Sequence, residues 1–200
     1  MNPLKTVAGT IIGGVVLAVI IAAATTGINL NTGSLIVWVH VLAGITWIGL
    51  LYYFNFVQVP ALADAAGDEG GPGGAGITKY VAPRALWWFR WGAALTWLSG
   101  AAYLVLLGRF RHAFELGMVE GGTQQDMIIG VGAWLGTIML FNVWVLIWPN
   151  QKKILGMVDA SDAEVAKARA VAFAASRTNT LLSIPMLMSM VGYGHGGFFL

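Results

Sequence analysis

The sequence predicts an all-α membrane protein, in which five transmembrane helices form a bundle and one amphipathic helix lies on the membrane surface. Three observations favour this fold class. Only 10% of the 200 residues are charged, whereas about a quarter are charged in soluble domains. Apolar residues make up 58% of the chain, more than a soluble fold of this length could bury. Five apolar stretches each reach the roughly 20 residues that cross a bilayer.

The five predicted spans belong to a single membrane domain that covers residues 1–200. Helix is the only regular state open to such a stretch in lipid, because an isolated strand would leave its backbone groups unpaired. The first stretch is too long for the apolar core of a signal peptide, so we expect it to be retained. The spans are expected at about residues 7–28, 34–59, 85–107, 127–148 and 178–199.

Residues 162–177 have an amphipathic pattern, with Ala and Val on one face and basic side chains elsewhere. Ser161 and Glu164 have the spacing of a capping box at the start of a helix. We expect this helix to lie on the membrane surface.

Basic residues indicate the orientation of the chain in its membrane. Nine of the eleven Lys and Arg residues fall at the N-terminus and in the second and fourth loops, and only Arg109 and Arg111 lie on the other side. Because basic loops remain in the cytoplasm, we expect a multi-pass protein of a bacterial inner membrane. Its N-terminus would be cytoplasmic and its C-terminus periplasmic.

Composition also excludes several functions. The chain has no cysteine, which excludes disulfides, thiolate metal sites and covalent attachment of c-type haem. The net charge of +2 and the scattered basic residues give no support to nucleic-acid binding. No acyl-transfer triad, phosphate-binding loop or carboxylate pair occurs within a predicted span.

Two histidines lie inside predicted spans, where ionisable residues are costly and indicate function. At 1.5 Å per residue, His40 lies roughly 9 Å from the outer end of its helix and His195 roughly 8 Å from the outer end of its own. Two imidazoles at one depth can ligate the iron of one haem b from both sides. We therefore predict His40 and His195 as metal ligands; a hydrogen bond between helices is the alternative for either one.

Neighbouring residues fit a haem site. Gly44 lies one turn from His40 on the same face, and glycines flank His195, which leaves space for a flat macrocycle. Trp47, two turns from His40, would pack against the ring. Arg109 and Arg111 are candidates to pair with the haem propionates.

Other polar or sulfur-bearing residues have simpler interpretations. His112 is expected to be a solvated loop residue. The methionines favour packing, and an axial ligand from among them is the less favoured alternative; the candidates are Met186, Met188 and Met190. Five polar residues near the inner helix ends would form a hydrogen-bonded structural cluster or a small-molecule pocket; they are Asn142, Asn150, Gln151, Arg177 and Asn179.

Three segments carry a family resemblance. The first starts at His40 and reads His-Val-Leu-Ala-Gly-Ile-Thr-Trp-Ile-Gly. The second starts at Leu86 and reads Leu-Trp-Trp-Phe-Arg-Trp. The third combines Trp-Pro-Asn-Gln-Lys-Lys, from Trp148, with Asn-Thr-Leu-Leu-Ser-Ile-Pro-Met, from Asn179. In order and approximate spacing, residues 34–197 resemble the membrane domain of the bacterial membrane-bound urate oxidase (urate hydroxylase) family.

The resemblance implies an oxidase of urate or a similar purine. Full-length members carry further membrane segments and a C-terminal cytochrome c domain, so this chain resembles a short form that would use a separate cytochrome c acceptor. It reads Arg177-Thr-Asn where the family is expected to have His-Asn-Asn, which places urate chemistry in question.

Three functions remain open at this point. The first is a b-type haem electron-transfer protein that works with a periplasmic cytochrome c or as a subunit of a larger respiratory-type redox complex. The second is the urate or purine oxidase that the resemblance implies. The third is a cofactor-free structural accessory subunit of a membrane complex, and a copper site built from His and Met is a further alternative.

Overall fold

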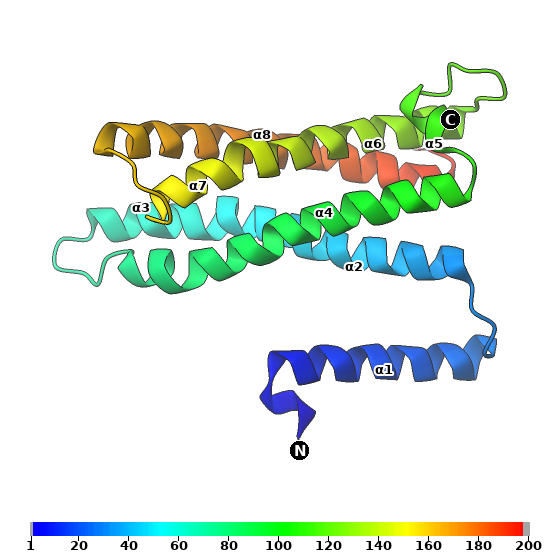
Figure 1. The fold of residues 1–200 in the computed structure, drawn as a ribbon, viewed down its shortest axis with the longest axis horizontal. Coiled ribbons are helices and arrows are strands. Elements are labelled where there is room, and N and C mark those ends of the chain that lie inside the picture. The colour runs from blue at the N-terminus through cyan, green and yellow to red at the C-terminus, as the bar shows by residue number, and fades with distance from the viewer. Residues whose placement is uncertain (1, 198–200) are drawn as a thin grey trace. The chain divides into compact units, whose positions relative to one another are not determined.

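The computed structural model describes residues 2–197, which form helices and no strands (Figure 1). The all-α prediction is therefore confirmed for the described part of the chain. Contacts divide the chain into two units, Met1–Leu35 and Ile36–Leu200.

The first unit contains a short 3-10 helix, Pro3–Lys5, and helix α1, Val7–Thr26. Thr6 caps α1, because its hydroxyl accepts a hydrogen bond of 3.0 Å from the backbone of Gly9. No residue of α1 is buried, and the helix is apolar on every side. A helix of this kind is expected to lie in lipid. Its bounds agree with the predicted span at residues 7–28.

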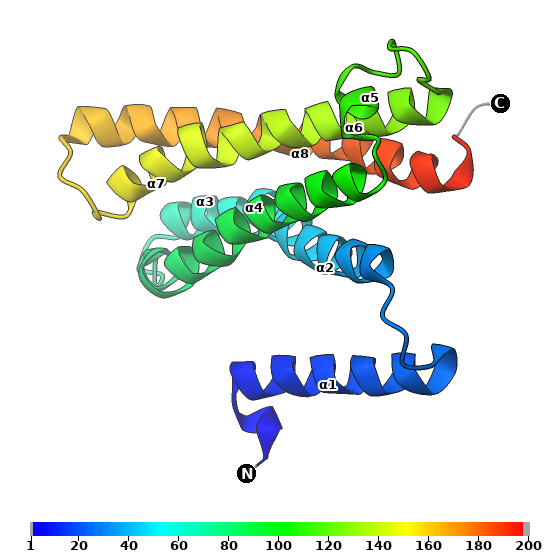
Figure 2. The same cartoon turned by 45° about the vertical axis from the view of Figure 1, so that its right-hand side comes forward.

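The second unit holds the remaining helices, several of which contain a π-helical turn. Helix α2 (Thr32–Tyr53) continues through the π-helix η2 (Phe54–Gln58) into α3 (Val59–Gly67). The π-helix η3 (Ile77–Val81) leads into α4 (Ala82–Leu106), and the short α5 is Phe110–Phe114. Helix α6 (Gln124–Phe141) continues through η4 (Asn142–Ile147) into α7 (Trp148–Ile154), and α8 is Asp162–His195. Helices α6 and α8 run side by side in both ribbon views (Figure 1 and Figure 2).

Each π-helical turn ends two residues before a proline. The prolines are Pro60, Pro83 and Pro149, the second residues of α3, α4 and α7. A proline has no N–H to donate and clashes with the carbonyl one turn earlier, and a widened turn before it gives the ring more room. For this reason the helices predicted at 34–59 and 127–148 continue to Gly67 and Ile154 as bent rods.

Helix α8 corrects the prediction of a separate surface helix at residues 162–177. That segment is the first half of one 34-residue helix. Its start is as predicted, because the Glu164 carboxylate accepts a hydrogen bond of 2.9 Å from the backbone of Ser161. The alanines of its apolar face are buried within the bundle instead of facing lipid headgroups; they are Ala168, Ala172 and Ala175. The predicted end of the fifth span, at residue 199, lies outside the described residues.

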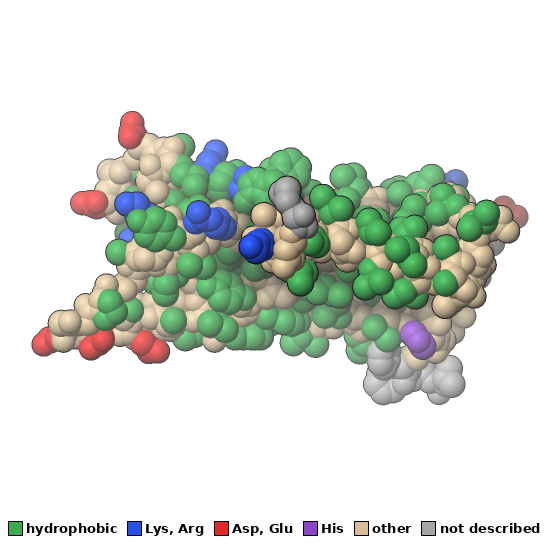
Figure 3. Space-filling model, turned by 90° about the horizontal axis from the view of Figure 1, so that it is seen from below, with side chains coloured by type: hydrophobic (Ala, Val, Ile, Leu, Met, Phe, Trp, Pro, Cys, Tyr) green, Lys and Arg blue, Asp and Glu red, His purple; other side chains and the backbone are tan. Residues whose placement is uncertain are grey.

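Three helices are long and apolar enough to cross a membrane: Val7–Thr26, Thr32–Gly67 and Gln124–Ile154. They support membrane association. The predicted count of five is not reached on length and composition, because α4 carries two arginines and four tryptophans and the second half of α8 contains polar residues such as Asn179 and His195. Hydrophobic side chains are spread along the whole face drawn in Figure 3, as expected for a surface in contact with lipid.

The bundle core packs large apolar residues against a small polar pair. Trp47, Leu51 and Phe89 are buried in the main hydrophobic cluster. Beside it, Asn142 donates a hydrogen bond of 2.8 Å to the side chain of Asn179, which donates one of 3.0 Å to a backbone carbonyl. The predicted polar cluster thus exists as an asparagine pair that joins η4 to α8.

Two other members of that predicted cluster have separate partners. Asn150 donates to the carbonyl of Leu146 within its own helix. The Arg177 guanidinium lies over the ring of Phe173. The structural interpretation therefore holds for the two buried asparagines.

Candidate cofactor-binding cavity

A cavity of about 670 Å³ lies among α2, α4, α6 and α8. This volume is within the range of small-molecule and cofactor sites. Most of the lining is apolar, and glycines occur on three of the four helices. The side chains in the lining that carry a nitrogen or oxygen are His40, Trp47, Tyr52, Thr96, Trp97, Tyr103 and Tyr193.

His40 is held in one orientation by the neighbouring helix. Its Nδ1 lies 2.8 Å from the backbone oxygen of Thr96, and the hydroxyl of Ser99 is 3.4 Å from the same nitrogen. Because a carbonyl oxygen can only accept, Nδ1 carries the proton and Nε2 carries the lone pair. Nε2 has no hydrogen-bond partner within residues 2–197. An imidazole fixed by its Nδ1–H and free at Nε2 is the arrangement found in metal-ligating histidines.

Glycine at position 100 makes room for this imidazole. A Cβ atom at Gly100 would lie 2.9 Å from Cε1 and 3.1 Å from Nδ1 of His40, closer than side chains normally approach. Gly44, predicted from the sequence, also lines the cavity, and a Cβ there would meet Thr96 Cγ2 at an ordinary 3.7 Å. Gly100 is thus the glycine on which the position of His40 depends.

Trp47 lies in the wall of the cavity, as the haem prediction requires. It is 2% exposed and belongs to the main core cluster. Its Nε1 is buried and has no hydrogen-bond partner among the described residues. Buried indole N–H groups usually have an acceptor, so this part of the wall has one polar group without a protein partner.

His195 lies elsewhere. It is the last residue of α8, its side chain is exposed, and its Nδ1 is 2.9 Å from the carbonyl of Val191. Val191 and Tyr193 line the cavity, whereas His195 does not. Ligation by His40 and His195 together therefore stays a prediction. Met186 and Met190, from the alternative ligand set, do line the cavity.

Both predicted propionate partners already have carboxylate partners. Arg109 forms a bidentate ion pair with Asp126, and the distance between Nε and Oδ1 is 2.8 Å. The Asp126 side chain is only 2% exposed. Arg111 pairs with Glu115 at 2.7 Å. Neither arginine lines the cavity.

The structure corrects the interpretation of His112 as a solvated loop residue. His112 lies in α5, is partly buried, and its Nδ1 is shielded from solvent without a partner in the described part of the chain. Helix α5 could not be predicted from the sequence, because it has only five residues.

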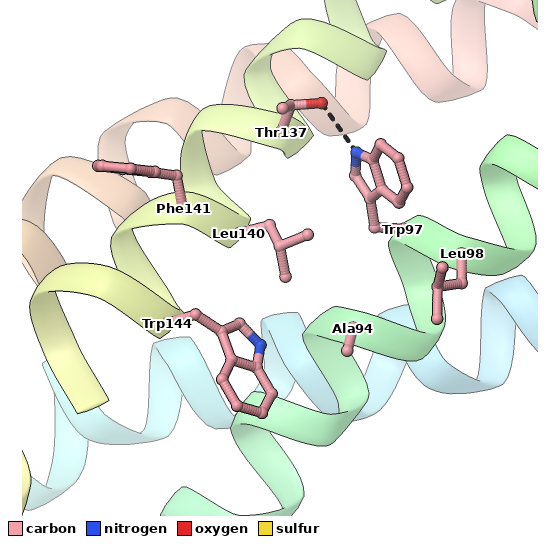
Figure 4. A pocket seen from close by; sticks show the side chains of 7 residues that line it. All are labelled: Ala94, Trp97, Leu98, Thr137, Leu140, Phe141 and Trp144. Carbon is pink, nitrogen blue, oxygen red and sulfur yellow. Dashed lines mark hydrogen bonds between the residues drawn. The ribbon is translucent and has the colours of Figure 1, made fainter. Parts of the chain in front are cut away.

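A second, outward-facing groove of about 420 Å³ lies between α4 and the α6–η4 helix (Figure 4). Trp97 donates a hydrogen bond of 2.8 Å from its Nε1 to the hydroxyl of Thr137 across this groove. Trp97 also lines the central cavity, so its indole forms a wall between the two spaces.

Sequence reasoning missed Thr96 and Gly100. The segment Thr96-Trp-Leu-Ser-Gly100 is similar in sequence to Thr46-Trp-Ile-Gly49. In the structure, this segment faces His40 across the interface between α2 and α4. The described residues contain no group of three or more His, Cys, Asp or Glu side chains able to hold a bare metal ion. A haem iron needs only one or two protein ligands.

Comparison with known proteins supports the family resemblance. No curated protein and no solved structure matches the chain significantly. A family model described as "Urate oxidase N-terminal" matches residues 110–199, which include α5, α6, α7 and α8. Residues 110–199 are therefore similar to the urate oxidase N-terminal family.

Proposed function

We propose that the central cavity binds a b-type haem with His40 as an axial ligand, and that the chain transfers electrons in a membrane. The observation that carries this proposal is the state of His40. Its Nδ1–H is bonded to the Thr96 carbonyl, and its Nε2 lone pair has no partner among residues 2–197 and lies at a mainly apolar cavity. A mainly apolar pocket with a single fixed imidazole suits a haem better than a polar substrate.

The residues present fit such a group. Thr96 would orient the imidazole, Gly100 leaves space for it, and Trp47 offers an apolar wall whose N–H has no partner in the described part of the chain. When bound, the haem supplies a one-electron carrier whose potential depends on its axial ligands and on burial. The protein's part is to hold the imidazole and to exclude water. The second ligand would be His195, or alternatively Met186 or Met190 from the cavity wall.

Five spans remain our proposal for the topology. Helix α4 has 25 residues and α8 has 34, so each exceeds the roughly 20 needed to cross a bilayer. Both carry large apolar side chains that are more than half exposed, such as Leu98 on α4 and Leu181 and Ile184 on α8. In water such exposure would be unfavourable, and in lipid it is the normal state.

With five spans, the basic residues favour a cytoplasmic N-terminus and a periplasmic C-terminus in a bacterial inner membrane. His40, near the start of α2, would then lie toward the periplasmic face. A haem at that level would exchange electrons with a periplasmic cytochrome c or with a larger respiratory-type complex.

The proposal is tested with purified protein and a reduced-minus-oxidised difference spectrum. We expect a b-type α-band in the wild type and in His112→Ala, and no such band in His40→Ala. His112 is the matched control, because it is a partly buried histidine outside the cavity lining.

A second candidate is a urate or purine oxidase-like enzyme that uses a separate cytochrome c acceptor. The match to the urate oxidase N-terminal family favours it. Membranes that contain the protein would then bleach urate absorbance when cytochrome c is added. A protein with no haem and no urate activity that co-purifies with a stoichiometric partner would instead be a structural subunit.

A further inference from the structure

Two cations share one tryptophan where α4 meets α7. The Arg90 guanidinium carbon lies 3.9 Å from the centre of the Trp148 ring, and Lys152 Nζ lies 6.0 Å from it, so the cations are no more than about 10 Å apart. Neither cation has a carboxylate partner within residues 2–197. The adjacent Lys153 differs, because it pairs with Glu164 at 3.2 Å.

This arrangement leaves hydrogen-bond donors without acceptors and positive charge without a counterion in the described part of the chain. A guanidinium has five N–H donors, and those of Arg90 meet no acceptor in the described residues, although its side chain is partly buried. The Trp148 ring attracts the two charges but accepts no hydrogen bond in its plane. Two like charges within a Debye length repel each other. An anion with several oxygens would satisfy the donors and remove the repulsion.

The surroundings indicate where that anion comes from. Trp87, Trp88 and Trp91 flank Arg90 on α4, each nearly half exposed, and exposed indoles of this kind collect at the membrane–water interface. An anion at this level is most readily a lipid headgroup.

An apolar groove begins close to the cation pair. Its nearest lining residues are Ala94, one turn from Arg90, and Trp144, one turn from Trp148, and it runs on to Leu98 and Leu140 (Figure 4). Its volume is about 420 Å³ and its lining is almost wholly apolar. Two cations about one helical turn from an apolar groove match the two parts of a phospholipid.

We propose that Arg90, Trp148 and Lys152 bind the phosphate of an anionic phospholipid, and that the groove between α4 and η4 holds one of its acyl chains. The lipid binds on the outward side of Trp97, whereas the central cavity lies on the other side. The lipid site is therefore independent of the proposed haem.

Native mass spectrometry of the detergent-solubilised full chain tests the site. Dioleoyl-phosphatidylglycerol and dioleoyl-phosphatidylcholine are titrated separately, and the single-lipid adducts are measured. We expect phosphatidylglycerol to bind more tightly by about fivefold per cation, the factor that corresponds to about 1 kcal/mol for each charge. Arg90→Gln and Lys152→Gln should each lose about one such factor, and Arg90→Lys should retain most of the preference.

Two further variants separate the site from general surface charge and from a free anion. Arg84→Gln removes the same charge from the same helix, where the guanidinium bonds the Tyr80 carbonyl instead of facing Trp148, and should change nothing. Ala94→Phe fills the groove and should weaken phosphatidylglycerol binding with all charges kept. Equal binding of both lipids by the wild type would overturn the proposal, as would an equal loss in Arg84→Gln and Arg90→Gln. Full displacement by millimolar inorganic phosphate with no effect of Ala94→Phe would show a simple anion site and overturn the lipid assignment.

Discussion

Alanine at position 100 would place a methyl carbon 2.9 Å from Cε1 of His40 and 3.1 Å from its Nδ1. Ordinary carbon–carbon contact is ~3.5 Å or more, so the imidazole must retreat from α4 by about 0.6 Å. Thr96, whose carbonyl holds Nδ1 at 2.8 Å, is also on α4. A shift of this size takes the hydrogen bond beyond its normal upper limit of about 3.2 Å.

Loss of this bond should weaken haem binding while leaving His40 in the chain. Partners that orient a metal-ligating histidine typically contribute about 10- to 100-fold to affinity, and we expect a loss of that order in Gly100→Ala. The assay is a haem titration of the purified protein, followed by the Soret absorbance. Helix content by circular dichroism checks that the variant is folded.

Gly136→Ala is the matched control, because Gly136 lines the same cavity and a Cβ there meets nothing within 4 Å. It should bind haem as the wild type does. Equal haem affinity in Gly100→Ala and the wild type would show that His40 does not depend on its contact with α4. Equal losses in the two glycine variants would show instead that the effect comes from the cavity in general.

Two other predictions concern the ends of the helices. Arg109→Ala leaves the buried carboxylate of Asp126 without its cation, so the thermal midpoint in detergent should fall by several degrees, whereas Arg111→Ala, at an exposed pair, should hardly change it. At the start of α8, hydrogen bonds from Ser161 lower the pKa of Glu164 to about 2. The cap should therefore stabilise the helix fully above pH ~4.5 and lose its effect as the pH falls toward 2. Circular dichroism across this range should show the loss, and Ser161→Ala should weaken the pH dependence; an unchanged profile would contradict it.

Much of the fold follows from local sequence features. The apolar runs place α1 and the beginnings of α2, α4 and α6 within a few residues, because burial in lipid needs about 20 apolar residues in a row. The capping box at Ser161 and Glu164 marks the start of α8, since it depends only on residues close in sequence.

Features that depend on packing between helices were not predictable. Pro149 reads as the end of a helix, but the π-helical turn before it lets the helix continue to Ile154. Residues 162–177 read as a surface helix, but their alanines pack against a neighbouring helix whose position the sequence does not reveal. The same limit applies to Thr96 and Gly100, which reach His40 through the register of two helices far apart in sequence.

For the site itself, the sequence identified His40, Gly44 and Trp47, and all three line one cavity. His40 could be predicted as a site residue because an ionisable side chain within an apolar span indicates function. The prediction that Arg109 and Arg111 pair with the haem propionates depended only on their positive charge. Charge does not show that Asp126 and Glu115 lie within reach of these arginines.

Ligation of a haem by His40 is tested by a reduced-minus-oxidised difference spectrum of the purified protein. We expect a b-type α-band in the wild type and in His112→Ala, and none in His40→Ala at equal protein concentration and helix content. A wild type without the band, or a His40→Ala variant that keeps it unchanged, would show that His40 does not hold a haem.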